Sequence, residues 1–151
     1  MNVYKKIFLS FHLIILFLVF SGCSNKNSPE YAVNEIIKYY NNGDVLSFWN
    51  MVVPEEKYAV SSNMAANIDN YDLFSIMAYA LNKDNITPDN LSSEEYLYGS
   101  FKIILGDKDM EFVSLEKIDD TTYYGSVKLG EKYAVIPLKL VDGKWYMKIK
   151  E

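Results

Sequence analysis

The sequence predicts an α+β domain in which helices pack on one face of a curved antiparallel β-sheet. In the first half of the chain, apolar residues recur at the spacing of amphipathic helices. In the second half, apolar and polar residues alternate in short runs that are separated by turn dipeptides. Residues 83–93 are rich in Asn, Asp, Ser and Pro, which is typical of a loop, and they divide the two halves.

Four helices are predicted in the first half. The first begins at Pro29, which follows the N-cap residue Ser28, and its periodicity stops before Gly43. Asp44 can cap a short second helix, and Pro54 ends it because proline disfavours helical geometry in the preceding residue. The third and fourth helices are expected over residues 54–66 and 71–81.

Five strands are predicted after the loop, over residues 101–105, 111–118, 122–129, 132–141 and 144–150. The clearest turn signal is Asp142-Gly143, because both central residues of a type I′ hairpin turn need positive φ. Pro137 cannot donate a ladder hydrogen bond, so we expect it at an edge position or at a bulge. Trp145 is expected to fill the space between the sheet and the first helix.

The first 22 residues have the three-part layout of a secretory signal peptide, which cleavage would remove. Lys5 and Lys6 precede an apolar run, and the small pair Ser21-Gly22 comes directly before Cys23, the only cysteine. The segment Ser21-Gly22-Cys23 resembles the lipobox of bacterial lipoproteins. This resemblance implies cleavage before Cys23 and a diacylglyceryl group on its thiol, and two acyl chains hold a protein firmly at a membrane.

An uncleaved transmembrane anchor is the alternative for this segment, but a spanning helix needs about 20 apolar residues. The apolar run over residues 7–20 is shorter and contains Ser10 and His12. A lone exported cysteine could also be a free thiol or form an intermolecular disulfide. The position of Cys23 after two small residues favours lipidation.

The chain is therefore predicted to have three parts. Residues 1–22 are a lipoprotein signal peptide, residues 23–28 are a lipidated tether, and residues 29–151 form a single α+β domain.

Composition excludes several classes of partner and chemistry. Removing the two lysines of the signal leaves 13 lysines against 20 acidic residues, a net charge of −7, so nucleic acid is not expected as a partner. The chain has no arginine, which makes bidentate recognition of phosphate or carboxylate unavailable. The only histidine, His12, lies in the signal, so zinc sites built from His and Cys and nucleophile–histidine pairs are not expected either.

Two stretches resemble the NTF2-like superfamily of cone-shaped, cystatin-like α+β domains, in particular its DUF4878-like lipoprotein members. One is the opening helix with its Gly-Asp stop, over residues 32–44, and the other is the closing hairpin over residues 134–138 and 142–146. The resemblance implies a hollow between sheet and helices that binds a small molecule. It also implies that homodimers can form through the sheets, and some members are enzymes.

Aromatic side chains are candidates to line such a hollow, although aromatic residues at helical spacing more often form the core. The residues concerned are Tyr39, Tyr40, Phe48, Trp49 and Tyr79.

An enzyme of this type would use a buried carboxylate as the base and a Tyr as the oxyanion donor. The carboxylates considered for this role are Asp44, Asp72, Glu111 and Glu116, and we expect all of them to be solvated.

Two further clusters have simple interpretations. Asp107, Asp109 and Glu111 alternate around a turn but lack the central glycine and terminal glutamate of a calcium loop, so solvation of the turn explains them better. Lys144, Lys148 and Lys150 could contact anionic headgroups, or they form the solvated side of the last strand.

Taken together, these patterns predict a lipid-anchored, extracytoplasmic protein on the outer face of a bacterial cell membrane. We expect a non-catalytic binding or interaction module without metal or cofactor, whose partner is a protein or a small apolar ligand. The alternative is a small-molecule enzyme that uses a buried carboxylate with a Tyr.

Overall fold

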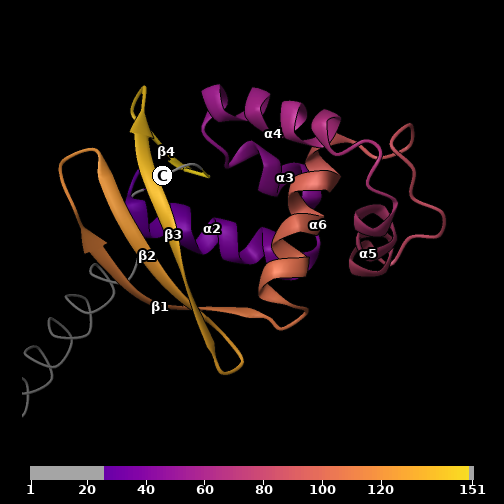
Figure 1. Ribbon diagram of the computed structural model, residues 1–151. Coiled ribbons are helices and arrows are strands. Elements are labelled where there is room, and N and C mark those ends of the chain that lie inside the picture. The colour runs from indigo at the N-terminus through magenta and orange to yellow at the C-terminus, as the bar shows by residue number, and fades with distance from the viewer. Residues whose placement is uncertain (1–25, 150–151) are drawn as a thin grey trace, which may run out of the picture.

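The structure, a computed structural model, describes residues 26–149, so the predicted signal peptide, Cys23 and Lys150 lie outside the described residues. Within that range, five helices precede a four-stranded antiparallel sheet that does not close, which confirms the α+β class (Figure 1). The helices are α2 (Pro29–Asn42), α3 (Val45–Asn50), α4 (Pro54–Ala66), α5 (Tyr71–Leu81) and α6 (Ser93–Leu105). The strands are β1 (Met110–Lys117), β2 (Thr122–Leu129), β3 (Lys132–Val141) and β4 (Lys144–Met147).

Helix α2 crosses one face of the sheet and contacts all four strands. Its start is as predicted, because Ser28 Oγ accepts a hydrogen bond from the N–H of Tyr31 at 3.1 Å and Pro29 occupies the first turn. Gly43 ends the helix with a φ of 67°, a left-handed conformation that glycine adopts without strain. The apolar side of α2 is buried against the sheet, and this interface forms much of the core.

The other helices gather around α6, since α3, α4 and α5 all pack against it. In Figure 1, α6 stands beside the sheet with α4 above it, and α5 lies on the side of α6 that faces away from the sheet. The predicted second, third and fourth helices are confirmed as α3, α4 and α5.

The predicted strand over residues 101–105 is wrong, because these residues are the last part of helix α6. The helix starts at a capping box, in which Ser92 Oγ accepts from the N–H of Glu95 and the Glu95 carboxylate accepts from the N–H of Ser92. A short apolar run fits a strand or a helix equally well, and here the cap upstream decides between them. Gly106 ends this helix.

The sheet is a simple meander in the order β1-β2-β3-β4, with β2 and β3 at the predicted bounds. Asp142 and Gly143 have φ of 50° and 77°, as a type I′ turn requires, so that prediction is confirmed. The register of β1 against β2 shifts between Phe112 and Ser114, which marks a bulge near the start of β1.

Pro137 lies within β3 at the point where β4 ends, which agrees with the predicted edge position. Of the two predicted alternatives, the bulge does not occur, since the pairing of β2 with β3 continues in register through Pro137. Strand β4 is also shorter than predicted, because the last β3–β4 pair is Leu138 with Met147. Lys148 donates its backbone N–H to the carbonyl oxygen of Pro137 at 2.8 Å, but Pro137 has no N–H to complete the pair.

At Met147, the outer edge of β4 is hydrogen-bonded to the connection between α3 and α4. The N–H of Met147 donates to the carbonyl oxygen of Met51 at 2.6 Å, and the N–H of Val53 donates to the carbonyl oxygen of Met147 at 3.0 Å. A further bond runs from the N–H of Ile149 to Glu56 Oε2 at 2.6 Å. These bonds fix the end of the described chain against the first turn of α4.

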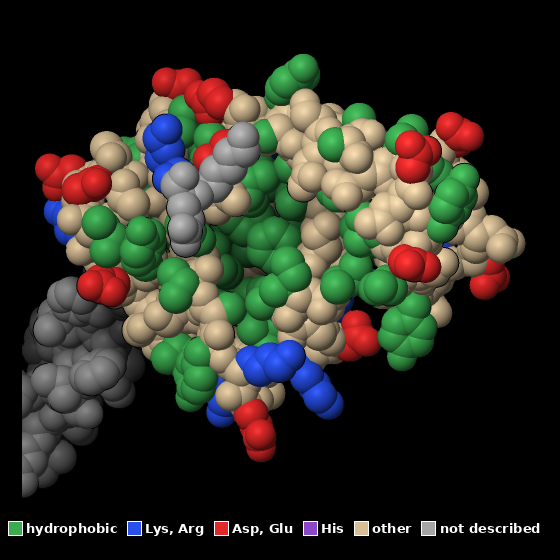
Figure 2. Space-filling view, viewed as in Figure 1, with side chains coloured by type: hydrophobic (Ala, Val, Ile, Leu, Met, Phe, Trp, Pro, Cys, Tyr) green, Lys and Arg blue, Asp and Glu red, His purple; other side chains and the backbone are tan. Residues whose placement is uncertain are grey.

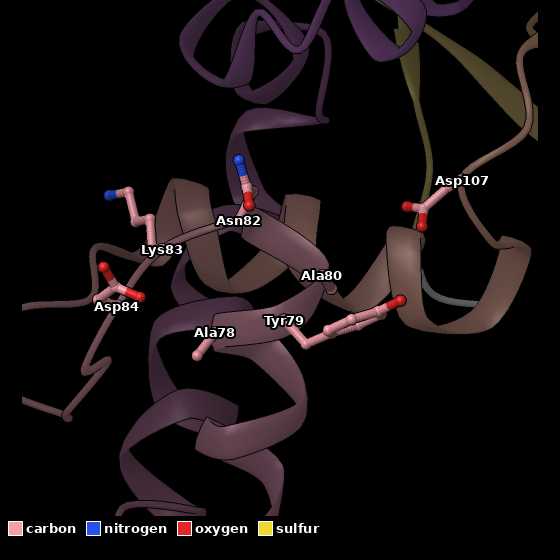
Figure 3. A pocket seen from close by; sticks show the side chains of 7 residues that line it. All are labelled: Ala78, Tyr79, Ala80, Asn82, Lys83, Asp84 and Asp107. Carbon is pink, nitrogen blue, oxygen red and sulfur yellow. The ribbon is translucent and has the colours of Figure 1, made fainter.

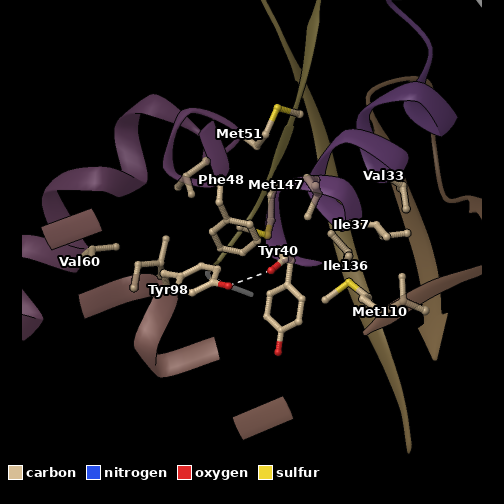
Figure 4. Packing of buried hydrophobic residues seen from close by; sticks show 14 of the residues in the cluster. Val33, Ile37, Tyr40, Phe48, Met51, Val60, Tyr98, Met110, Ile136 and Met147 are labelled. Atoms are coloured by element: carbon tan, nitrogen blue, oxygen red, sulfur yellow. Dashed lines mark hydrogen bonds between the residues drawn. The ribbon is translucent and has the colours of Figure 1, made fainter. Parts of the chain in front are cut away.

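The core is continuous between sheet and helices and is rich in aromatic rings (Figure 4). Tyr40, Phe48 and Tyr98 pack together with ring centroids 5.6 to 6.1 Å apart, and Tyr98 donates its hydroxyl to the carbonyl oxygen of Tyr40 at 2.8 Å. Trp145 is only 7% exposed and meets the ring of Tyr123 edge to face at 5.2 Å. The prediction that Trp145 belongs to the core is confirmed.

Between residues 26 and 149, no helix combines the length and the apolar character that crossing a bilayer demands.

Candidate functional site

An apolar groove of about 490 Å³ lies between the sheet and helices α4 and α6, and we call it the groove. Figure 2 shows it as a hollow near the middle of this face, lined by hydrophobic side chains. Its volume is within the range of ligand pockets, roughly 300 to 1,000 Å³. The lining residues are Ala59, Val60 and Asn63 of α4, Tyr96, Leu97, Ser100, Phe101 and Ile104 of α6, Val135 and Pro137 of β3, and Lys148 and Ile149.

The helical wall of the groove follows from the sequence of α6. Leu97, Phe101 and Ile104 are spaced by four and three residues, so they project from one side of the helix. Ile104 is 72% exposed at the rim, and Val135 on the opposite wall is 56% exposed. Large apolar side chains that stay exposed around a hollow are a common mark of a binding surface.

A single charged residue, Lys148, lines the groove. It is held in place from two sides, because its own N–H is bound to Pro137 and the next N–H, of Ile149, is bound to the Glu56 carboxylate. Lys148 forms no ion pair with any other residue in the described part of the chain. The groove therefore has an apolar floor with one positive charge at the end near α4.

The five aromatic residues considered as pocket candidates do not line this groove. Tyr40 and Phe48 are buried in the core, whereas Tyr39 and Trp49 are half-buried elsewhere. Tyr79 is 84% exposed on α5. The structure thus distributes these five residues between the core and the surface.

A second cavity, of about 570 Å³, lies beside the C-terminal end of α5 and includes Tyr79 and Asp107 (Figure 3). Its polar side chains point in different directions, with Lys83 and Asp84 on the side away from Tyr79. Lys83 is also paired with Glu95. Since a ligand site needs polar groups that converge, the larger cavity is the weaker candidate.

A third, smaller cavity of about 200 Å³ contains a carboxylate next to a tyrosine. Tyr39 donates its hydroxyl to Glu35, and Lys38 pairs with the same carboxylate at 3.1 Å. The hydrogen bond from Tyr39 lowers the pKa of Glu35, and it raises the pKa of Tyr39 to about 12. A general base that works near neutral pH needs a raised carboxylate pKa, so the electrostatics of this pair oppose such a role.

The four carboxylates considered as catalytic bases are all exposed, as predicted. Asp44 caps α3 by accepting from the N–H of Ser47 at 3.1 Å, and the side chain and the backbone N–H of Ser47 together lower the pKa of Asp44. Asp72 lies in the first turn of α5, while Glu111 and Glu116 lie on β1. None of these positions is a desolvated site.

The turn carboxylates Asp107, Asp109 and Glu111 are exposed, which agrees with the predicted solvation. Among the residues that the structure describes, no group of three or more His, Cys, Asp or Glu side chains could hold a metal ion. Lys144 lines the third cavity, and its ammonium lies 4.9 Å from the ring centre of Tyr146.

Sequence reasoning missed the groove because it missed helix α6. The pattern Ser92-Ser93-Glu94-Glu95 before an apolar run is a capping-box signature, and this signature indicates the start of a helix. With the helix recognised, Leu97, Phe101 and Ile104 would have been placed on one face. The contribution of β3 and Lys148 could not be found this way, since it depends on where β4 stops.

Comparisons of this chain with protein-family models, curated proteins and solved structures gave no match.

Proposed function

We propose that this protein is a bacterial lipoprotein whose domain is a non-catalytic binding module, held at the outer face of the cell membrane through Cys23. The observation that carries the binding role is the groove, which combines an apolar lining with one lysine that is unpaired among the described residues. Ligand sites typically have this composition, with a mostly apolar lining and a few placed polar groups.

The lipid anchor is supported by the sequence before the domain. Ser21-Gly22-Cys23 follows an apolar run that has lysines ahead of it, and residues 24–28 form a short polar segment. A tether of this length keeps the domain, which starts with α2 at Pro29, close to the bilayer. A membrane surface is therefore the setting in which the groove meets its ligand.

We also propose a distant relation to the NTF2-like superfamily. The order of helices before an antiparallel meander and the location of the groove between sheet and helices support this relation. The enzyme alternative rests on Glu35 and Tyr39 alone, and the lowered pKa of Glu35 argues against it. Binding is the role that the geometry favours.

The binding role is tested with the fluorescent probe anilinonaphthalene sulfonate, whose emission rises in apolar sites. We expect the wild-type domain to enhance its emission and the variants Ile104→Glu and Val135→Glu to lose most of this effect. Ile76→Glu is the matched control, because Ile76 is 51% exposed on α5, away from the groove. Equal emission from all four proteins, or none from the wild type, would refute the groove as a binding site.

The anchor is tested separately by metabolic labelling with palmitate in a bacterial host. Label should enter the wild-type chain and should not enter Cys23→Ala. Ser24→Ala serves as the control for a change beside the modified residue. Label in the Cys23→Ala protein would remove the anchor from the proposal without affecting the groove.

A further inference from the structure

One wall of the groove is a strand edge that no other strand covers. Strand β3 extends from Lys132 to Val141, but its pairs with β4 run only from Leu138 to Val141. The stretch before Pro137 therefore has a partner on one side, β2, and none on the other within the described residues. Val135 belongs to this stretch and lines the groove.

The alternation of hydrogen bonds along β3 shows which backbone groups face that open side. Pro137 directs its carbonyl oxygen away from β2, since this oxygen accepts from Lys148 on the β4 side. In an antiparallel sheet, the N–H and C=O of one residue point to the same side, and the side alternates along the strand. The N–H and C=O of Tyr133 and Val135 therefore point to the same side as those of Pro137.

These four backbone groups have no intramolecular partner among the described residues. No turn, loop or side-chain hydrogen bond reaches the N–H or C=O of Tyr133 or Val135. Both side chains are also exposed, at 68% and 56%. An uncovered row of donors and acceptors of this kind is a template for a further strand.

The opposite wall provides contacts for the side chains of such a strand. Leu97, Phe101 and Ile104 face the groove from α6, while Val60 faces it from α4. An extended chain laid along β3 would turn alternate side chains toward these helices. Strand addition takes its affinity from backbone hydrogen bonds and its specificity from pockets of this type.

On the basis of the proposed function, in which the groove is the binding site, we infer that the ligand is an extended peptide segment. This segment adds to β3 as an antiparallel strand. The segment continues the ladder where β4 stops, pairing first with Val135 and then with Tyr133. The end of the segment next to Lys148 meets a positive charge, which favours an acidic side chain there.

A single segment fits this edge better than a second copy of the domain. Pairing of two sheets edge to edge needs open space beside the strand, and here α4 and α6 stand on the other side of the groove. These walls enclose about 490 Å³, the size of a site for one ligand and not for a second domain. The domain therefore receives a strand rather than another sheet.

The test uses a capped hexapeptide in which Thr and Val alternate, at millimolar concentration, with affinity measured by NMR titration of the wild-type domain. Val135→Pro removes the donor N–H at the open edge without removing any bond of the folded sheet. Val135→Thr is the matched control, since it changes the side chain but keeps the N–H. We expect about a tenfold loss of affinity in the proline variant and less than about twofold in the threonine variant.

Two further readouts separate strand addition from general apolar binding. Amide exchange at Tyr133 and Val135 should slow when the peptide is bound, while Lys139, already paired with Tyr146, should not change. Two methylated peptides are compared, one with its Val amides methylated and one with its Thr amides methylated. Because only one of these two sets of amides faces β3, one methylated peptide should bind and the other should not.

The inference is overturned if no hexapeptide binds, if both methylated peptides bind like the parent, or if Val135→Pro and Val135→Thr bind equally. Anilinonaphthalene sulfonate has no backbone amides, so its binding to the same domain reports on the groove alone. Retained probe binding with failed peptide binding would reject strand addition and leave the proposed function standing. Failure of both would reject the proposed function as well.

Discussion

The backbone N–H of Lys148 donates to the carbonyl oxygen of Pro137 at 2.8 Å, and the proline ring prevents the reciprocal bond. Strand β4 therefore ends one residue earlier, at Met147, although the chain still runs beside β3. Both residues of this incomplete pair line the groove. One missing N–H thus marks the place where the sheet stops and the candidate binding site begins.

Replacing this proline should lengthen the ladder. In Pro137→Ala, the new amide at position 137 faces the carbonyl oxygen of Lys148 and should become protected from hydrogen exchange. The new hydrogen bond should stabilise the folded state, whereas loss of the proline ring gives the unfolded chain more conformational freedom and so favours unfolding. Because these two effects oppose each other, the free energy of unfolding should change by less than about 1 kcal/mol. Exchange at this amide as fast as in an exposed loop would contradict the pairing.

Deleting the indole of Trp145 should destabilise the domain strongly. Trp145 is 7% exposed and contacts Tyr123, so Trp145→Ala leaves a large cavity between the sheet and α2. We expect a loss of about 3 to 5 kcal/mol in urea unfolding. Tyr133→Ala, at an exposed position of β3, is the control and should change stability by at most about 0.5 kcal/mol. A midpoint for Trp145→Ala equal to that of the control would place the indole at the surface.

The close approach of α2 to the sheet at Gly125 predicts an overpacking effect with a specific rescue. A Cβ added at Gly125 would lie 2.6 Å from Val33 Cγ2, so one of the two must move. Gly125→Ala should cost about 1 to 3 kcal/mol. Combining it with Val33→Ala should recover part of this loss, which a double-mutant cycle in urea would measure as a coupling between the two sites.

Gly99 provides the opposite control for this substitution. A Cβ at Gly99 would meet the Leu81 side chain at 3.4 to 3.6 Å, close to ordinary contact, and the residue lies inside helix α6. Gly99→Ala should therefore stabilise the domain by up to about 1 kcal/mol. If both glycine variants lost the same stability, the contact of Gly125 with Val33 would not be the cause.

The Glu35–Tyr39 pair predicts a defined pH dependence. The hydrogen bond from Tyr39 holds the pKa of Glu35 below its usual value of 4.5, so the folded state binds the proton less readily than the unfolded state. The pair therefore stabilises the fold above about pH 4.5, and this contribution is lost as the pH falls through the lowered pKa. Tyr39→Phe should raise the Glu35 pKa, measured by carboxyl NMR titration, and reduce the loss of stability between neutral and acidic pH. An unchanged Glu35 titration in that variant would rule the bond out.

Local signals in the sequence predicted much of the fold. The cap at Ser28, the stop at Gly43 and the Asp142-Gly143 turn each depend on one or two residues and their own backbone, so the printed sequence reveals them. The same is true of the alternation that buries Ile136 and Leu138 in β3. These features need no knowledge of distant contacts.

The remaining features depend on residues far apart in the chain. The run from Phe101 to Leu105 fits a strand as well as a helix, and only the cap at Ser92 and the packing of α6 against α3, α4 and α5 settle it. The end of β4 depends on Pro137, which lies ten residues before Met147. Since the groove is formed where these two features meet, the candidate site could not be predicted before the fold was known.

Met51 and Val53 bond to both backbone groups of Met147, and this clasp has a consequence for how copies of the protein associate. A filament built by sheet pairing grows only when every molecule has two exposed sheet edges, one for each of its two neighbours. The clasp occupies the edge of β4 at Met147, and helices α4 and α6 stand beside the uncovered stretch of β3, so contact between the sheets of two copies would be restricted to β1 and would stop at a closed pair. Copies of the domain at high local concentration are therefore not expected to polymerise through their sheets.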